Sequence, residues 1–220
     1  MAFDLNNPLI SIILPVFNRR HLVMRAIHSV EAQTIDDWEL LIIDDGSWDA
    51  VEQDILPLVA ERPNYRYMKH AQRRLSASRN IGMHAALGHF VTFLDSDDEY
   101  RPDHLELRLS FMKENPAVDI IHGGVEIIGP LETHYVQDAF QPEKKIHISR
   151  CCVGATFFGK KSAFIESGGF KELPYSAESE LLPRLEAQFN VKKVDFPTYC
   201  YYTGLKDSIC AQRREQATKK

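Results

Sequence analysis

The pattern of apolar and polar positions in residues 9–100 predicts strands that alternate with helices. Three continuous apolar runs indicate strands buried on both faces, at 11–17, 40–43 and 89–94. Apolar residues at helical spacing predict helices at about 21–33, 51–60 and 76–87, and a short strand is expected at 65–69. This order favours right-handed crossovers and a mainly parallel sheet with helices on both faces, which is an α/β fold.

Three residues set the expected ends of these elements. Pro15 has no N–H to donate to a strand ladder, so the first strand should end there. Ser76 is of a type that caps helices and should begin the third helix. Gly88 comes just after the last apolar position of that helix and should stop it.

Residues 101–212 follow a less regular pattern. Helices are expected at 102–114 and 160–167, and a third should begin near Ser179 so that Pro183 lies in its first turn. Short strands are expected at 118–122, 125–128, 156–158, 191–196 and 198–202, and the polar stretch 131–149 indicates a loop. Because no repeat or linker interrupts the chain, we expect a single domain over 1–220, with lobes at 9–100 and 101–212 and a tail at 213–220.

Polar segments follow three of the predicted strands at the points where these strands end. The segments are 15–18, 44–47 and 95–98, and they contain five aspartates: Asp44, Asp45, Asp95, Asp97 and Asp98. In an open parallel sheet the carboxyl ends of the strands share one edge, and ligands bind there. Five carboxylates on one edge would repel one another. The pattern therefore predicts a binding site that attracts a cation.

The sequence Asp95-Ser96-Asp97 is an oxygen-rich site of the kind that suits magnesium or manganese. A divalent metal there would bridge a carboxylate and a diphosphate, and would stabilise charge on a departing diphosphate. Three arginines flank the start of the third predicted helix: Arg73, Arg74 and Arg79. Arg79 lies in the first turn, where backbone N–H groups also favour an anion.

Charge and composition narrow the classes of partner. Residues 1–100 carry 9 basic and 15 acidic side chains, and residues 101–220 carry 17 and 16, so neither half has the basic excess of a nucleic-acid-binding protein. The four cysteines form no C-x-x-C pair and are typical of a reducing cytosol. No apolar run approaches the roughly 20 residues of a membrane-spanning helix. We expect a cytoplasmic protein with at most peripheral membrane contact, made through basic residues in 213–220 at the inner face.

Four ordered motifs in this chain resemble those of the family 2 inverting glycosyltransferases of GT-A fold. The motifs are Pro15-Val-Phe17-Asn18, Ile43-Asp-Asp45-Gly-Ser47, Leu75-Ser-Ala-Ser-Arg79-Asn80-Ile-Gly82 and Phe93-Leu-Asp95-Ser-Asp97-Asp98. Gly168-Gly169-Phe170 and the acidic segment after it fit the same pattern, so the resemblance covers about residues 9–210. It implies a Rossmann-like sheet with a donor lobe and an acceptor lobe.

The resemblance implies roles for several residues of the donor lobe. Pro15, Phe17 and Asp45 would hold the nucleotide base, with the ring of Phe17 stacking on the base and Asp45 accepting an imide N–H. Arg79 would face the diphosphate. An aspartate contact to an imide is compatible with uracil or thymine, which favours a UDP- or dTDP-sugar donor, and guanine in a GDP-sugar is also compatible.

The resemblance further implies that Asp95 and Ser96 lie near the ribose and phosphates, and that Asp97 ligates Mn²⁺ or Mg²⁺. The chain departs from the family pattern at two places. Arg74 occupies a turn position where glycine is usual, and the segment 201–208 lacks the histidine that many relatives present to the metal.

The catalytic base is assigned by the resemblance to the segment Ala177-Glu178-Ser179-Glu180-Leu181. Relatives resemble Glu-Asp-x-Asp-Leu here, and the alignment puts Glu178 at the position of the base, with Glu180 as the alternative. The chemistry needs a carboxylate that removes the proton of the acceptor hydroxyl during attack on the anomeric carbon. A second interpretation is that both acids are simply favoured by the dipole at a helix start.

Two functional hypotheses follow. The first is an inverting, metal-assisted glycosyltransferase that moves a sugar from a nucleotide-diphosphate sugar to a hydroxyl of a glycan or a lipid-linked acceptor. The second is a nucleotide-sugar-binding pseudoenzyme or sensor, suggested by the altered Ala177-Glu178 segment. Donor binding without turnover would distinguish the second from the first.

Overall fold

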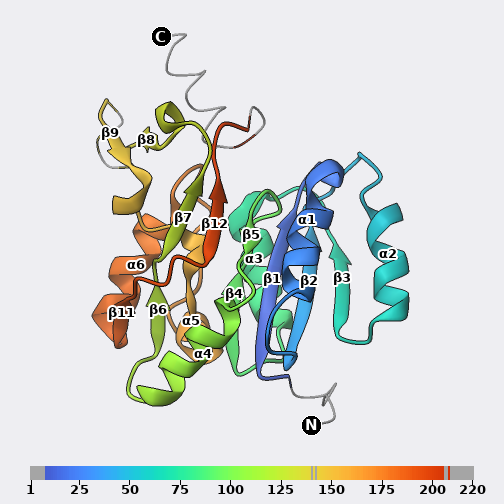
Figure 1. The fold of residues 1–220 in the computed structure, drawn as a ribbon, viewed down its shortest axis with the longest axis horizontal. Coiled ribbons are helices and arrows are strands. Elements are labelled where there is room, and N and C mark those ends of the chain that lie inside the picture. The colour runs from blue at the N-terminus through green and yellow to red at the C-terminus, as the bar shows by residue number, and fades with distance from the viewer. Residues whose placement is uncertain (1–7, 140, 142, 206–207, 209–220) are drawn as a thin grey trace.

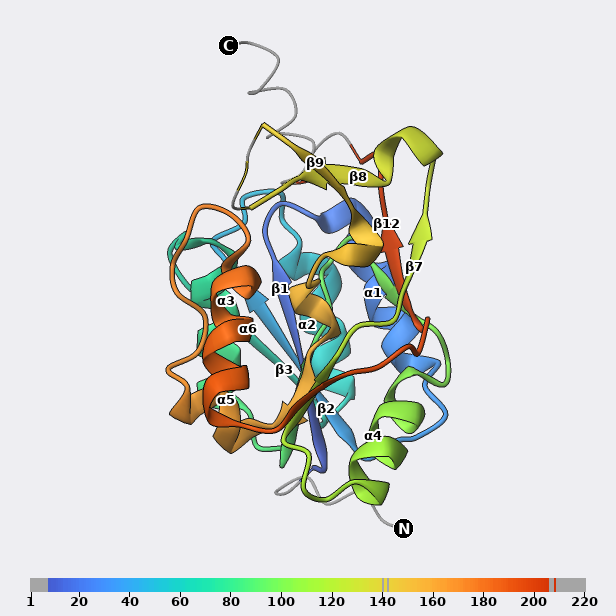
Figure 2. The ribbon, with the colours of Figure 1, turned by 90° about the vertical axis from the view of Figure 1, so that its left-hand side faces the viewer.

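A computed structural model describes residues 8–139, 141, 143–205 and 208 as three layers, with a central sheet between two layers of helices. The first half contains β1 (Ile10–Val16), α1 (Arg20–Glu31), β2 (Trp38–Asp44), α2 (Glu52–Glu61), β3 (Tyr65–Lys69), α3 (Arg74–Ala85), β4 (Phe90–Phe93) and β5 (Glu99–Tyr100). The second half contains α4 (His104–Glu114), β6 (Ile120–His122), β7 (Val125–Ile128), β8 (Tyr135–Gln137), β9 (Lys145–His147), β10 (Phe158–Lys160), α5 (Lys161–Glu166), α6 (Ala177–Gln188), β11 (Val191–Lys193) and β12 (Tyr199–Tyr202). Figure 2 shows α3, α5 and α6 on one face of the sheet and α1 and α4 on the other.

The central sheet has seven strands in the order β11-β6-β10-β4-β1-β2-β3. Strands β1 to β4 run parallel to one another, and β10 is antiparallel to both β4 and β6. A smaller sheet has the order β5-β12-β7, and β8 and β9 form a hairpin. The predicted α/β fold with a mainly parallel sheet is confirmed, and strands from both halves of the chain join the same sheet (Figure 1).

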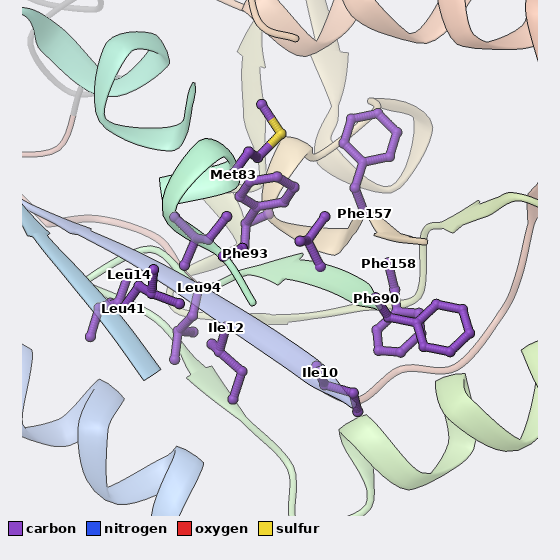
Figure 3. Close-up of a cluster of buried hydrophobic side chains, with 14 of the residues drawn as sticks. Ile10, Ile12, Leu14, Leu41, Met83, Phe90, Phe93, Leu94, Phe157 and Phe158 are labelled. Carbon is purple, nitrogen blue, oxygen red and sulfur yellow. The ribbon is translucent and has the colours of Figure 1, made fainter. Parts of the chain in front are cut away.

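The core lies where the faces of β1 and β4 meet the helices and strand β10 (Figure 3). Phe93 of β4 packs edge-on against Phe164 and Phe170, with ring centroids 5.8 and 5.3 Å apart, and Phe90 stacks on Phe158 at 5.4 Å. Each fully buried phenylalanine contributes roughly 1.5–3 kcal/mol to stability. This packing joins the two halves of the chain beneath the loops that follow the carboxyl ends of the parallel strands.

Strand β1 passes through Pro15 and ends at Val16, so the prediction that it stops at the proline is wrong by one residue. Pro15 pairs in register with Ile43 of β2, whereas the pairing of β1 with β4 ends at Ile13. The missing N–H of Pro15 therefore points to the side where no ladder partner remains. A proline is tolerated in a strand at such a position.

Helix α3 begins at Arg74, two residues before Ser76, so the predicted serine cap is wrong. The N-cap residue Arg73 makes no side-chain capping bond. The carboxylate of Asp45 instead accepts the backbone N–H groups of Arg73 and Arg74, at 2.6 and 2.8 Å. The cap is thus supplied by the turn after β2, and Ser76 is buried inside the helix.

Four predictions for the second half also need correction. The stretch 131–149, predicted as a loop, contains the β8–β9 hairpin. The predicted strand at 156–158 is a short 3-10 helix (Gly154–Thr156) followed by β10, and β11 stops at Lys193. Helix α6 begins at Ala177, so Pro183 lies in its interior. Alternating polarity is weak in three-residue strands, which is why their sequence pattern does not reveal them.

Two predictions concern positions outside the described residues. One is the tail at 213–220, and the other is Cys210, the last of the four cysteines. Within the described residues the other three cysteines form no disulfide, with Cys200 buried and Cys151 and Cys152 half-buried. Within the described part of the chain, no helix is both long and apolar enough to cross a membrane.

Candidate active site

The loops that follow β1 and β2 are joined into one rigid rim. The backbone N–H of Asn18 donates to Ser47 Oγ, and the backbone N–H of Trp48 donates to Asn18 Oδ1, each at 3.0 Å. A third bond runs from the N–H of Arg20 to Asp49 Oδ2 at 2.8 Å. These bonds bring together two segments that lie about 30 residues apart in the chain.

The residues expected to hold a nucleotide base lie along this rim. Pro15 is buried within β1, and Phe17 is half-buried just beyond its end. The ring of Phe17 meets the ring of Trp48 edge to face, with centroids 5.1 Å apart. Trp48 is 75% exposed. Trp48 belongs to none of the motifs recognised in the sequence, although its place directly after the Asp44–Ser47 turn is a signal that indicates it.

Asp45 is buried, and both of its carboxylate oxygens receive backbone N–H groups from the start of α3. His70 Nδ1 lies 3.6 Å from Asp45 Oδ1. Each carboxylate oxygen has two lone pairs, so these bonds leave acceptor capacity for a base N–H. Asp45 therefore fixes the start of α3 against the turn after β2 and still has lone pairs for a further hydrogen bond.

Asp44 is fully buried and serves the structure of the turn. It accepts hydrogen bonds from the Ser47 backbone N–H and the Tyr67 hydroxyl, and Lys69 Nζ lies 3.4 Å away. Burial opposes ionisation of Asp44, but the hydrogen bonds from Tyr67 and Ser47 and the charge of Lys69 outweigh it and lower its pKa. Asp44 is thus paired within the protein and needs no added cation.

Asp98, in the turn after β4, is held by β12. Its carboxylate accepts the Tyr199 hydroxyl and the Tyr202 backbone N–H, both at 2.8 Å, and the Tyr199 oxygen lies 3.3 Å from the N–H of Asp95. Burial and the charges of Asp97 and Asp95 raise the pKa of Asp98 well above its usual value. Tyr199 is a positioning residue that sequence reasoning missed, because only tertiary structure brings β12 to this turn.

Removing the Tyr199 hydroxyl should loosen the turn after β4. Tyr199→Phe takes a donor from the buried Asp98 carboxyl and an acceptor from the Asp95 N–H, so we expect unfolding free energy to fall by about 1–3 kcal/mol. Urea denaturation measures this change. Tyr135→Phe, at an exposed tyrosine of the hairpin, is the control and should change stability by less than about 0.5 kcal/mol. Equal stability of both variants would contradict the clamping role.

Asp97, the predicted metal ligand, lies between the buried residues Ser96 and Asp98 and is itself half-buried. Its backbone carbonyl accepts a hydrogen bond from Arg25 of α1 at 2.5 Å. Arg25 also pairs with Glu99 at 2.9 Å, and its guanidinium lies over the Tyr202 ring, 3.8 Å from the ring centroid. Helix α1 and strand β12 therefore fix the backbone at Asp97 from two sides.

Arg79 lies beneath the turn after β4 and is only 2% exposed. Its guanidinium donates to Asp95 Oδ1 at 2.7 Å and lies against the rings of Phe93 and Phe170. Burial opposes the charged form of Arg79, but the charges of Asp95 and Glu178 outweigh it and raise its pKa. Its Nε has no hydrogen-bond partner among the described residues.

Glu178 stands in the first turn of α6 and approaches Arg79 from the other half of the chain. Ser176, which precedes the helix in a left-handed conformation (φ 52°), donates from its hydroxyl to Glu178 Oε1 at 3.1 Å. Burial raises the pKa of Glu178, and the Arg79 charge partly offsets this rise. A Cβ added to Gly154 would lie 2.7 Å from the Arg79 guanidinium and 3.1 Å from Glu178 Cβ, so glycine is needed where these side chains meet.

Glu180, the alternative base, is engaged in ion pairs. It pairs with Arg184 at 2.8 Å and with Lys171 at 2.5 Å. Burial opposes ionisation of Glu180, but bonds from Arg184 and Lys171 outweigh it and lower its pKa. Arg184 also donates to the carbonyls of Ser167 and Gly169, so Glu180 helps to anchor α6 to the Gly168-Gly169 turn.

Asn80 joins the Gly168-Gly169-Phe170 segment to α3. Its amide donates to the carbonyl of Phe170 at 2.8 Å and accepts the N–H of Phe170 at 2.9 Å. This segment leads directly into α6. The two sequence motifs thus meet in space, and they place Glu178 relative to Arg79.

Backbone strain gathers around the same region. The non-glycine residues with positive φ among the described positions are Asn18, Ala50, Arg74 and Ser176. Asn18 follows β1 and Ala50 follows β2. Arg74 begins α3, and Ser176 directly precedes α6. Such conformations cost about 1–3 kcal/mol each and persist where the surrounding structure holds them, often at functional sites.

The aspartates after β2 and β4 could bind a metal ion only if other oxygen ligands completed its coordination. Within the described ranges, no group of three or more His, Cys, Asp and Glu side chains is arranged to hold a metal ion. Asp44, Asp45 and Asp98 accept hydrogen bonds from protein donors, and Asp97 lies in the same turn as Asp95, which is paired with Arg79. Magnesium and manganese commonly bind through one or two carboxylates and substrate phosphates, so the residues present fit such a metal.

Known sequences that resemble this chain are bacterial glycosyltransferases. An uncharacterized glycosyltransferase of Rickettsia conorii is 40% identical over 111 residues, 50% of this chain and 18% of the relative. The UDP-Glc:alpha-D-GlcNAc-diphosphoundecaprenol beta-1,3-glucosyltransferase WfgD of Escherichia coli is 37% identical over 120 residues, 54% of this chain and 47% of the relative. These matches span less than half the length of either relative.

Solved structures share the fold at low sequence identity. S. aureus TarS in complex with UDP-GlcNAc superposes with a TM-score of 0.74 at 16% identity, covering 91% of this chain and 60% of that one. The mannosyltransferase PcManGT of Pyrobaculum calidifontis, in complex with GDP-Man and Mn²⁺, gives 0.73 at 14% identity, covering 100% and 67%. The sequence profile of Glycosyl transferase family 2 matches residues 11–169, and the chain belongs to this family.

Proposed function

We propose that this chain is the catalytic part of an inverting glycosyltransferase that moves a sugar from a nucleotide-diphosphate sugar to an acceptor hydroxyl. One observation carries the proposal. Arg79 donates to Asp95, just beyond the carboxyl end of β4, and both Arg79 and Glu178, at the start of α6, lie against Gly154. The charge of one buried arginine thus acts on a donor-side carboxylate and on the candidate base, which lie on opposite halves of the chain.

The donor is expected to lie along the rim formed by β1, β2 and β4. Phe17 stacks on the base, Asp45 accepts a base N–H, and the backbone at Pro15 lines the site. Asp95 and Ser96 lie near the ribose and phosphates. Arg79 acts from beneath through Asp95, because it is almost fully buried. The solved relatives named above hold UDP-GlcNAc or GDP-Man, which supports a UDP- or dTDP-sugar, with GDP as the alternative.

Asp97 would hold Mn²⁺ or Mg²⁺ together with oxygens of the donor diphosphate. The bound metal supplies Lewis-acid stabilisation of the charge that builds on the leaving diphosphate. Within the protein, Arg25 and Tyr199 fix the turn that presents Asp97. The presence of Mn²⁺ in the PcManGT structure supports the metal by analogy only.

Glu178 is proposed to act as the base. It removes the proton of the acceptor hydroxyl while that oxygen attacks the anomeric carbon from the face opposite the diphosphate. The raised pKa of Glu178 suits this task, because a stronger base accepts the proton more readily. Glu180 is already paired with two cations, which favours Glu178.

The acceptor is proposed to be a glycan or a lipid-linked glycan, in keeping with the diphosphoundecaprenol-linked substrate in the name of WfgD. Such an acceptor is anchored in a membrane, and a protein that uses it would work at the inner face. We therefore propose a cytoplasmic location with peripheral membrane contact.

A nucleotide-sugar panel tests the function. We expect UDP-, dTDP- or GDP-sugars to bind with Mn²⁺, and Asp97→Ala to weaken that binding by about tenfold or more, since it removes the protein's proposed ligand to the metal. Calorimetry with and without Mn²⁺ measures binding, and release of nucleoside diphosphate measures turnover.

Asp36→Ala, at an exposed aspartate before β2, is the matched control and should bind like the wild type. Donor binding without turnover on any acceptor would favour a sensor over an enzyme. Binding of all donors independently of metal and of Asp97 would refute the metal's role.

A further inference from the structure

We propose that Trp48 forms a second aromatic wall of the nucleobase site, beside Phe17. This inference rests on the proposed function, because it assumes that a nucleotide donor binds along the rim. It adds a residue to which none of the family motifs in this chain assigns a role. Trp48 is a large exposed aromatic ring next to the expected position of the base.

The chain has two tryptophans, and they differ sharply. Trp38, at the start of β2, is 7% exposed and donates from its indole N–H to the carbonyl of Ile35. Trp48 is 75% exposed, and its ring contact is with Phe17. A single exposed apolar side chain is not unusual on a protein surface. Its location on the rim is what calls for an explanation.

The backbone under Trp48 is held firmly, so its ring is presented from a fixed base. Its N–H donates to Asn18 Oδ1, Ser47 accepts a backbone N–H from the loop after β1, and Asp49 accepts one from the first residue of α1. Ala50 follows with φ at 60°, a conformation that costs energy for a residue with a side chain. The loop is therefore strained and held by hydrogen bonds, and it leaves the indole ring of Trp48 exposed to solvent.

The chemistry of that position fits a nucleobase. The ring of Phe17 meets the Trp48 ring almost perpendicularly, at 85°, so the two rings form a corner. A planar base that stacks on one ring would meet the other at its edge or face. Stacking on aromatic side chains contributes to binding of every base, because each base has a π-face. Trp48 should thus strengthen nucleotide binding with little preference among bases.

The test uses UDP, dTDP and GDP, each with Mn²⁺, and tryptophan fluorescence. Subtracting the emission of Trp48→Phe from that of the wild type isolates Trp48. We expect saturating nucleotide to reduce acrylamide quenching of Trp48 by about twofold or more, and Trp48→Ala to weaken nucleotide binding by about tenfold. Trp48→Phe should retain binding within about threefold, because it keeps an aromatic ring.

Two controls separate direct contact from other effects. Inorganic pyrophosphate with Mn²⁺ lacks a base, so its affinity should be equal in the wild type and Trp48→Ala. Leu56→Ala, at an exposed leucine of α2, should leave nucleotide affinity unchanged. The position is exposed, so the Trp48 variants are expected to fold, and circular dichroism checks this.

The outcomes distinguish this inference from the function on which it rests. If a nucleotide binds but Trp48 quenching and the affinity of Trp48→Ala are unchanged, the aromatic wall is refuted and the proposed function stands. An equal loss of pyrophosphate and nucleotide affinity would also refute it, since the effect would then not involve the base. If none of the three nucleotides binds the wild type, both proposals fail.

Discussion

Replacing Glu178 with glutamine is expected to lower the turnover of sugar transfer by about 10²–10⁴-fold, the contribution typical of a general base. Glutamine keeps the size of the side chain and its contact with Ser176 but cannot accept the proton. Donor affinity should change little, because Glu178 belongs to the acceptor side. Steady-state kinetics with calorimetry of donor binding measures both quantities.

The pH profile gives a second readout of the same residue. Burial raises the pKa of Glu178, and a base acts only when deprotonated. Activity of the wild type should therefore rise with pH through a pKa above the ordinary value of about 4.3. The residual activity of Glu178→Gln should lack this acid limb. A limb that persists in the variant would assign the ionisation to another group.

Glu180→Gln is the matched control, two residues further along the same helix. It weakens the pairs with Arg184 and Lys171, so a small loss of stability is expected with turnover within about threefold of the wild type. If Glu180→Gln lost activity while Glu178→Gln kept it, the roles of the two glutamates would be reversed.

Replacing Arg79 with methionine is expected to lower the unfolding free energy by about 3 kcal/mol, the lower end of the cost of removing one partner from a buried ion pair. The lower end applies because the Asp95 side chain is 23% exposed, whereas Arg79 is buried. Methionine fills a similar volume against Phe93 and Phe170. Urea denaturation at several pH values measures the change.

The sign of the pH dependence follows from Glu178. Without Arg79, the folded-state pKa of Glu178 should rise further above its unfolded value, because the Arg79 charge opposes the rise caused by burial. A carboxyl with a raised pKa holds its proton more tightly in the folded state, so stability falls as pH rises through that pKa. The destabilisation of Arg79→Met should thus be smallest near pH 4 and grow toward neutrality.

The same variant should move the acid limb of activity to higher pH, which a purely structural defect would not do. Arg73→Met is the control, because Arg73 is the N-cap residue of the same helix but its side chain makes an exposed ion pair with Glu172. Such pairs contribute little, so its stability should change by less than about 1 kcal/mol. A pH-independent loss in Arg79→Met would contradict coupling between Arg79 and Glu178.

The sequence by itself determined the parallel sheet, its first helices and the edge that carries the site. Apolar runs such as 40–43 must be buried on both faces, and polar turns such as 44–47 must follow them, so neighbouring residues are enough to reveal both. The sequence motifs also identified Phe17, Asp45 and Asp97 as candidate site residues. In the structure Phe17 and Asp45 come directly after β1 and β2, and Asp97 lies in the turn after β4. Their individual roles stay predictions.

Only the tertiary structure decided how each charged or polar group is paired. Asp45 caps α3, Tyr199 holds Asp98, and Arg79 donates to Asp95 and lies near Glu178. In each case the partner comes from a segment remote in the chain. Periodicity records which face of an element is buried, but the state of a buried carboxylate depends on the donors that packing brings to it. For that reason the sequence indicated five similar aspartates, whereas the fold gives them different partners, such as the start of α3 for Asp45, Arg79 for Asp95 and Tyr199 for Asp98.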